Sequence, residues 1–167
     1  MSPDKPRGHF PVSGRVEWIG VRTGRGQPVT ELQEVQAIQG RGLAEDHATR
    51  RSGGRRQVTL VQAEHLPVIE SLSERTPKPD LLRRNLLVSG INLRALVGQR
   101  FWVGAALLEG TGDCPPCRAM DAALGVGGKN AMAGMGGVTA RVLEGGLIRV
   151  GDSIGPYNLP ADQPRLI

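Results

Sequence analysis

The sequence predicts a small mixed barrel that is dominated by β-structure and carries a few short helices. Three observations lead to this class. Apolar segments with the pattern of strands are short and recur along the chain, 24 glycines among 167 residues supply closely spaced turns, and only modest stretches show helical spacing. We therefore expect one domain over residues 14–155, with a loose N-terminal tail at 1–13 and a C-terminal extension at 156–167.

The first predicted elements form a hairpin. Residues 15–21 alternate well enough for a half-buried strand, and the turn at 24–28, which holds two glycines and a proline, leads into a second strand at 29–37. A long polar loop then runs from Gly40 to Arg56 and is rich in arginine. Long loops between ordered elements often carry function, so this basic loop is a candidate binding segment.

The middle of the chain predicts two strands separated by two helices. Residues 57–61 are typical of a buried strand, and the next segment, 63–72, has helical spacing of its leucines and isoleucine, with Pro67 in the first turn. A second short helix is expected to begin with Asp80 as its N-cap and to continue to Arg84. Residues 86–88 then return to strand.

The last third predicts further strands around a short helix. Residues 101–110 favour a strand or a strand pair, and 117–124 favour a helix that ends at Gly125. The glycine-rich segment 125–137 is expected to be flexible, and its first part, 125–129, is a candidate mobile lid over the cysteine. Strands at 138–143 and 147–150 complete the pattern.

Composition and charge narrow the classes of function. The 39% hydrophobic and 22% charged residues are ordinary for a globular domain, and no apolar run approaches the roughly 20 residues that span a bilayer. The absence of an export pattern favours the cytoplasm, and no membrane partner is expected. The net charge of +5 favours anionic partners, but the aromatic content of 3% argues against nucleic acid, because proteins that bind single strands stack the bases on exposed aromatic rings.

The only two cysteines, Cys114 and Cys117, form a Cys-x-x-Cys motif with two prolines between them. Thiols are reactive when ionised, which cationic neighbours such as Arg118 favour. Redox, metal or sulfur chemistry are the alternatives to inert burial. A thioredoxin-like motif occurs early in its fold, unlike this one, and a structural zinc site needs four ligands, so no zinc is expected.

Several separated segments carry a family resemblance when they are taken together. They are, in chain order, Gly42-Leu43-Ala44-Glu45-Asp46-His47, Arg56-Gln57-Val58-Thr59-Leu60 with Ala63-Glu64-His65, Arg83-Arg84-Asn85-Leu86-Leu87-Val88-Ser89-Gly90-Ile91-Asn92-Leu93, the cysteine segment, and Gly136-Gly137-Val138-Thr139-Ala140-Arg141-Val142-Leu143-Glu144-Gly145-Gly146-Leu147-Ile148-Arg149-Val150-Gly151-Asp152. This set resembles the MOSC domain, which occurs at the C-terminus of molybdenum cofactor sulfurases, in the mitochondrial amidoxime-reducing component and as stand-alone bacterial proteins. The resemblance covers about residues 14–155 and is to the stand-alone type.

The resemblance implies a closed MOSC-like β-barrel and one functional cysteine. In cofactor-binding members the second cysteine of the motif ligates molybdenum, and that position here is Cys117, which alternatively carries sulfur as a persulfide. Cys114 is an auxiliary candidate. The pterin of the molybdenum cofactor ends in a phosphate, for which the candidate residues are Arg84, Asn85, Arg118, Lys129, Arg56 and His47, with Arg55 and Arg83 as further cations. The implied partner is a sulfur donor such as a cysteine desulfurase, or a molybdenum cofactor enzyme.

Two departures from the family pattern bear on function. Glu45 stands where many members have glycine, so it adopts a positive φ less easily and adds negative charge near the expected anion site. The chain also lacks the additional N-terminal barrel of the amidoxime-reducing enzymes. A cofactor-binding or sulfur-carrying protein is therefore the first hypothesis. The alternatives are a molybdenum-dependent reductase of N-hydroxylated compounds and a binding module with inert cysteines whose basic loop, Arg50 to Arg56, docks an acidic partner.

Overall fold

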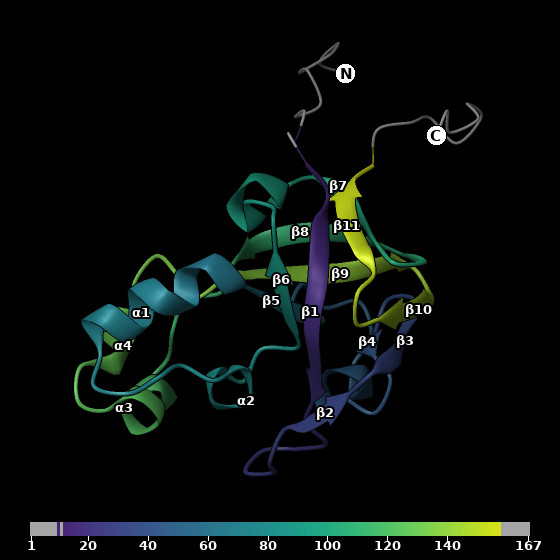
Figure 1. Cartoon of the computed structure of the whole chain (residues 1–167). Coiled ribbons are helices and arrows are strands. Elements are labelled where there is room, and N and C mark those ends of the chain that lie inside the picture. The colour runs from purple at the N-terminus through teal and green to yellow at the C-terminus, as the bar shows by residue number, and fades with distance from the viewer. Residues whose placement is uncertain (1–9, 11, 158–167) are drawn as a thin grey trace.

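A computed structural model describes residue 10 and residues 12–157, and most of them form a closed β-barrel (Figure 1). Within this part of the chain, the barrel is a ring of seven hydrogen-bonded strands. In the order of the ring they are β1 (Gly14–Val21), β6 (Leu86–Ser89), β5 (Val58–Gln62), β9 (Val138–Glu144), β8 (Ala106–Asp113), β7 (Arg100–Val103) and β11 (Ser153–Pro156). The predicted fold class, mainly β with a few short helices and a closed barrel, is confirmed.

The ring closes between the first strand of the chain and the last described one. β1 and β11 run antiparallel, with Gly14 opposite Ile154 and Arg15 opposite Ser153. The close packing at this point requires glycine at position 14, because a Cβ there would collide with Ile154, Ile91 and the Ser89 carbonyl. The closing strand β11 was not among the predicted strands, because only four residues pair and two of them are glycine and proline.

One pair in the ring is parallel, and it positions the helices. β5 and β6 are paired parallel, so the chain must cross over between them. The crossover holds a 3-10 turn η2 (Ala63–His65), helix α1 (Leu66–Leu72) and helix α2 (Pro79–Leu82). The predicted helix at 63–72 is confirmed in its α1 part, although Leu72 is 60% exposed and does not belong to the buried face. The second helix begins two residues earlier than predicted, because its N-cap is Lys78 and not Asp80, and Arg84 lies beyond its end.

The predicted second strand at 29–37 is wrong as a single element. It divides into β2 (Thr30–Leu32), which pairs with β1, and β3 (Glu34–Ile38), which joins a separate sheet with β4 (Gly42–Leu43) and β10 (Gly146–Arg149). The break falls at Gln33, whose carbonyl accepts a hydrogen bond from the amide of Val150. The hairpin between β1 and β2 is confirmed, and the strand at 147–150 becomes part of the small sheet.

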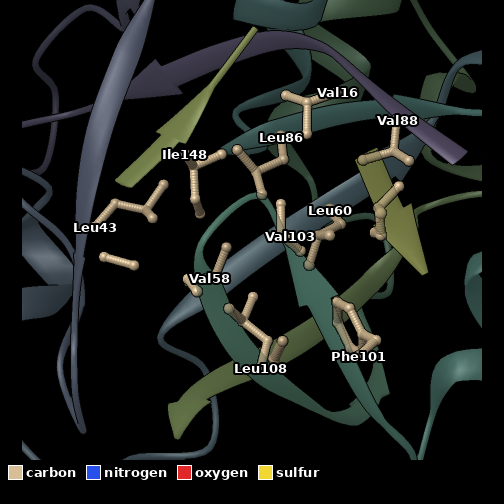
Figure 2. Close-up of a cluster of buried hydrophobic side chains, with 14 of the residues drawn as sticks. Val16, Leu43, Val58, Leu60, Leu86, Val88, Phe101, Val103, Leu108 and Ile148 are labelled. Atoms are coloured by element: carbon tan, nitrogen blue, oxygen red, sulfur yellow. The ribbon is translucent and has the colours of Figure 1, made fainter. Parts of the chain in front are cut away.

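The barrel interior is packed with aliphatic side chains from nearly every strand. Val58, Leu60, Leu86 and Val88 point into it, together with Phe101 and Leu108 (Figure 2). The alternate residues Val61 and Leu87 point to the opposite face, where they pack against the helices in a second cluster that includes Ile69, Leu82, Met120, Leu124 and Met132. Both faces of β5 and β6 are therefore buried, which explains their continuous apolar sequence.

The remaining short helices are η1 (His47–Arg50), η3 (Leu93–Leu96), α3 (Ala119–Leu124) and α4 (Gly128–Ala131). Helices α1, α3 and α4 gather on one side of the barrel (Figure 1). The helix predicted at 117–124 begins only at Ala119, and the segment 125–137 is not simply a flexible glycine linker, because it contains α4 and the buried Met132. No helix within the described residues is long and apolar enough to cross a membrane.

The domain limits predicted at 14–155 lie close to the ends of the ring, which begins at Gly14 and ends at Pro156. Most of the predicted tail at 1–13 and of the predicted extension at 156–167 falls outside the described residues.

Candidate functional site

A pocket of about 630 Å³ opens at one end of β1, beside the starts of β5 and β6. Three separate stretches of chain build its wall: the residues after β1, the loop through η1 to β5, and the residues between α2 and β6. The lining residues are Gly20, Val21, Arg22, Arg25, Val29, Asp46, His47, Ala48, Arg50, Arg51, Gly54, Arg55, Arg56, Gln57, Thr59, Arg83, Arg84 and Asn85.

The pocket is strongly basic. Eight arginines line it against a single carboxylate, Asp46. The formal net charge of the whole chain is +5, so this pocket holds a larger positive excess than the entire chain. None of the ion pairs among the described residues involves a pocket arginine. A concave surface with this charge attracts and retains anions.

The pocket floor is held by a buried pair, Asp46 and Asn85. Asp46 Oδ1 accepts hydrogen bonds from the Arg22 amide at 2.9 Å and from Asn85 Nδ2 at 3.3 Å, while its Oδ2 accepts from the Ala48 amide at 3.1 Å. Asn85 Oδ1 accepts from the Thr59 amide at 3.0 Å, and Nδ2 also donates to the Gly20 carbonyl at 3.0 Å. These bonds tie β1, the η1 loop, β5 and β6 together.

Arg84 connects the pocket to the cysteine segment. Its side chain is 3% exposed, and Nε donates to the Gly136 carbonyl at 2.8 Å, Nη1 to Leu82 at 3.2 Å and Nη2 to Cys114 at 3.3 Å. Burial is the largest cause that lowers the pKa of Arg84, and the positive charge of Arg56 lowers it further. The Cys114 and Cys117 side chains act in the opposite direction and raise it, Cys114 more strongly. Arg84 therefore positions backbone segments, and most of its donors are already used within the protein.

The cysteine segment is fixed against the start of β9. The Cys114 amide donates to the Gly137 carbonyl at 2.8 Å, and a Cβ at Gly136 would collide with the Cys114 carbonyl and with Pro116. Both thiols are free: Cys114 is buried and Cys117 is exposed. Cys117 lies just before α3, where its carbonyl accepts the Met120 amide at 2.9 Å. The exposed thiol of Cys117 is therefore the one that an external reagent meets first.

Two residues at the pocket have a left-handed backbone. Glu45 (φ 69°) and Arg83 (φ 56°) are the only non-glycine residues with positive φ in the described part of the chain. Glu45 directly precedes Asp46 on the pocket floor, and Arg83 is the residue at which α2 ends. Glu45 thus adopts the positive φ that glycine adopts more easily, and it does so at an energetic cost.

The structure separates the candidate residues into two groups. His47, Arg56, Arg84 and Asn85 line the pocket, as do Arg55 and Arg83. Arg118, the N-cap of α3, and Lys129 on α4 are exposed outside it, and the Lys129 amide donates to Asp121. Neither cysteine is among the lining residues.

The sequence analysis did not single out Arg22 and Arg25. Both lie in the polar turn that follows the first strand. Two arginines three residues apart in such a turn could have indicated an anion-binding position. Their neighbours in the pocket, Arg50 and Arg51, belong to the basic loop that the sequence did indicate.

The residues present fit an anionic cofactor better than a metal cage. Within residues 12–157 no group of three or more histidine, cysteine and acidic side chains is placed to hold a metal ion. An exposed thiolate can supply one soft ligand to a metal that its cofactor already chelates, and the unpaired guanidinium groups suit a phosphate.

Comparison with known proteins gives a consistent result. The family model of the MOSC domain matches residues 47–155. Among solved structures, YuaD from Bacillus subtilis has a TM-score of 0.72 with 20% identity, covering 86% of this chain and 94% of its own. YiiM from Geobacillus stearothermophilus has a TM-score of 0.70 with 17% identity, and the match covers 87% of this chain and 75% of YiiM. YiiM from Escherichia coli has a TM-score of 0.63 with 20% identity, and the match covers 91% of this chain and 73% of that YiiM. These structures share the fold. No curated protein sequence matches the chain.

Proposed function

Because the chain belongs to the MOSC domain family, which is linked to the molybdenum cofactor, we propose that it binds this cofactor with its phosphate in the arginine pocket and with Cys117 as the thiolate ligand of the metal. One observation carries the proposal: Arg84 lines the pocket and also bonds the backbone of the Cys-x-x-Cys segment. This contact supports a site in which anion recognition is coupled to the chemistry of the cysteine segment.

Each part of the site has its own task in this proposal. The unpaired guanidinium groups, among them Arg56 and Arg83, bind the phosphate oxygens. Arg84 and Asn85 hold the surrounding backbone, and Cys117 presents its sulfur at the surface. The cofactor, when bound, supplies the redox chemistry.

A second candidate is sulfur carriage, which the exposure of Cys117 favours. The Cys117 thiolate attacks the terminal sulfur of a donor persulfide, so a new S–S bond forms on Cys117 while the donor's S–S bond breaks. The donor leaves as a thiolate that takes up a proton, and no external oxidant is needed. The partner in this step is a protein with a cysteine persulfide, such as a cysteine desulfurase.

Mass spectrometry and metal analysis of the same samples test both candidates. The protein is incubated with isolated molybdenum cofactor, or with a cysteine desulfurase and cysteine, and then desalted. We expect molybdenum and pterin in stoichiometric amounts in the first case, or one added sulfur atom on Cys117 in the second. Cys117→Ala should lose both, and Cys114→Ala, the matched control, should keep at least one. A Cys117→Ala protein that retains cofactor and sulfur as the parent does would refute the proposal.

The remaining alternatives are separated by two additions to this experiment. Turnover of an N-hydroxylated base by the loaded protein with a reduced electron donor would identify a reductase. Binding of an acidic protein that weakens steeply with salt and ignores alkylation of Cys117 would identify a binding module with inert thiols.

A further inference from the structure

The pocket holds more free guanidinium groups than a single phosphate can use. Within the described residues, five of its arginine side chains have neither a hydrogen bond nor an ion pair: Arg22, Arg25, Arg51, Arg56 and Arg83. Arg50 and Arg55 each donate to a backbone carbonyl, of Thr23 and Thr111 respectively, and keep their charge. Seven cations besides the buried Arg84 therefore face one pocket.

A phosphate monoester carries a charge of about −2 and three terminal oxygens. Two arginines that bind it in bidentate fashion occupy most of those oxygens. The other guanidinium groups that line the same pocket carry like charge, which is unfavourable without more anionic charge. A second linked phosphate adds acceptor oxygens, and where it is terminal it also adds negative charge, so a diphosphate group can engage more of the free arginines than a single phosphate.

The shape and lining of the pocket favour a small ligand over a polynucleotide. Its volume of about 630 Å³ lies within the range of about 300–1,000 Å³ typical of small-molecule sites. No Phe, Tyr or Trp is present among the described residues that line it, whereas proteins that bind single-stranded nucleic acid stack the bases on such rings.

Arg83 provides independent support, because its backbone conformation is unfavourable for arginine. It stands at the C-terminal end of α2 with φ 56° and ψ 34°, a conformation that glycine or asparagine adopts at much lower cost. Its side chain is exposed at the pocket, and its guanidinium group has no partner among the described residues. A cation that persists at a strained position beside a cavity is typical of a binding residue.

We propose that the arginine pocket recognises a diphosphate group, with Arg83 as one of its direct contacts. The ligand is a nucleoside diphosphate or a cofactor that carries a nucleotide through a diphosphate bridge. In the latter case the inference rests on the proposed function, since it specifies which anionic end of the cofactor the pocket receives.

Calorimetric titration at fixed ionic strength tests this with inorganic pyrophosphate and orthophosphate, and with ADP and AMP. We expect pyrophosphate to bind at least about 10-fold more tightly than orthophosphate, and ADP to exceed AMP by a similar factor. Equal affinities within each pair would overturn the proposal. If the loaded protein releases a nucleotide on denaturation, the diphosphate belongs to the cofactor; if it binds ADP but releases none, it belongs to a free nucleotide.

Substitutions at Arg83 distinguish a contact from a structural residue. Arg83→Gly and Arg83→Asn both suit the left-handed backbone and remove the charge, so they should weaken pyrophosphate binding about 10-fold and raise the melting temperature by about 2 °C or leave it unchanged. Arg83→Lys should retain most of the affinity. Arg100→Ala removes an exposed positive charge outside the pocket and serves as the control. A lower melting temperature with unchanged affinity would exclude Arg83 as a contact.

The titrations are repeated on Cys117→Ala, in which the preference for pyrophosphate should persist. If the parent protein carries cofactor or sulfur on Cys117 but binds pyrophosphate no more tightly than orthophosphate, this inference alone would be refuted. A diphosphate preference without cofactor or sulfur on Cys117 would refute the proposed function alone.

Discussion

The guanidinium group of Arg84 donates to the carbonyl oxygen of Cys114 at 3.3 Å, although the two residues are 30 positions apart in the chain. The bond forms in a buried environment, and the same side chain also bonds the carbonyl of Gly136. Arg84 thereby fixes the position of the thiol segment relative to the barrel.

Substitution of Arg84 should therefore destabilise the protein. Arg84→Ala leaves three buried carbonyls without their donors, and we expect the free energy of unfolding to fall by about 2–4 kcal/mol. Arg84→Lys keeps the charge but lacks the forked donors, so we expect it to recover less than half of that loss. Urea denaturation measures both values. An unchanged or increased stability would mean that Arg84 serves only as an anion ligand.

Alanine at Gly136 should disturb the cysteine segment directly. Its Cβ would meet the Cys114 carbonyl and the Pro116 ring, so we expect a loss of about 1–3 kcal/mol together with a changed rate of Cys117 alkylation. Gly155→Ala is the matched control, because nothing lies within 4 Å of a Cβ there. Equal stability of the two variants, measured by thermal unfolding, would contradict the close packing at Gly136.

The two thiols should differ strongly in their reaction with iodoacetamide. Cys117 is exposed, whereas Cys114 is 1% exposed and its carbonyl accepts a hydrogen bond from Arg84. We expect peptide mass spectrometry of the native protein to find the label on Cys117 alone, and label on Cys114 only after denaturation. Cys117→Ala should then remain unlabelled in the native state. Comparable native rates at the two positions would show that Cys114 is accessible.

Glycine at position 45 should stabilise the η1 loop. Glu45 has φ 69°, which costs an L-residue about 1 kcal/mol more than glycine. We expect Glu45→Gly to raise the free energy of unfolding by about 0.5–1 kcal/mol. Glu45→Ala removes the same charge without relieving the backbone, so it should not. If the two variants gained equally in denaturant titrations, the gain would come from the lost charge.

The polar floor of the pocket predicts a pH-dependent defect in Asn85→Asp. The new carboxyl group would be buried beside Asp46 Oδ1, which in the parent protein accepts a hydrogen bond from Asn85 Nδ2 at 3.3 Å. Burial and the like charge raise the pKa of such a group in the folded state above its unfolded value of about 3.9. The variant should therefore be close to the parent below about pH 4 and lose stability relative to it as the pH rises. A pH-independent difference in unfolding free energy would argue against this electrostatic origin.

The strands of the barrel were largely predictable because their apolar pattern is local. Residues 15–21, 57–61 and 86–88 are strands in the structure, at nearly the predicted limits. The division of residues 29–37 between two sheets was not predictable, since it depends on a hydrogen bond between Gln33 and Val150, more than a hundred positions away. The closing strand β11 was missed for a similar reason: its pairing partners are distant and its own composition is weakly β-forming.

The candidate site was predictable in its residue types but only partly in its arrangement. Arg56 and Arg84 were identified through a family resemblance, and the structure places both at the pocket. Arg118 and Lys129 are near Cys117 in sequence but lie outside the pocket, because the chain turns into α3 and α4 on the side of the barrel. Arg22 joins the pocket through the pairing of β1 with β6, a contact between distant segments that no local pattern reveals.

The pairing of β1 with β11 also has a consequence for how the protein is made. β1 pairs with β2 and β6, but its residues Gly14 and Arg15 lack the partners that close the ring until residues 153–156 have been synthesised. Until then β1 and β7 each present an unpaired edge to other chains. Premature termination before Ser153 should therefore give an aggregation-prone product rather than a shortened barrel.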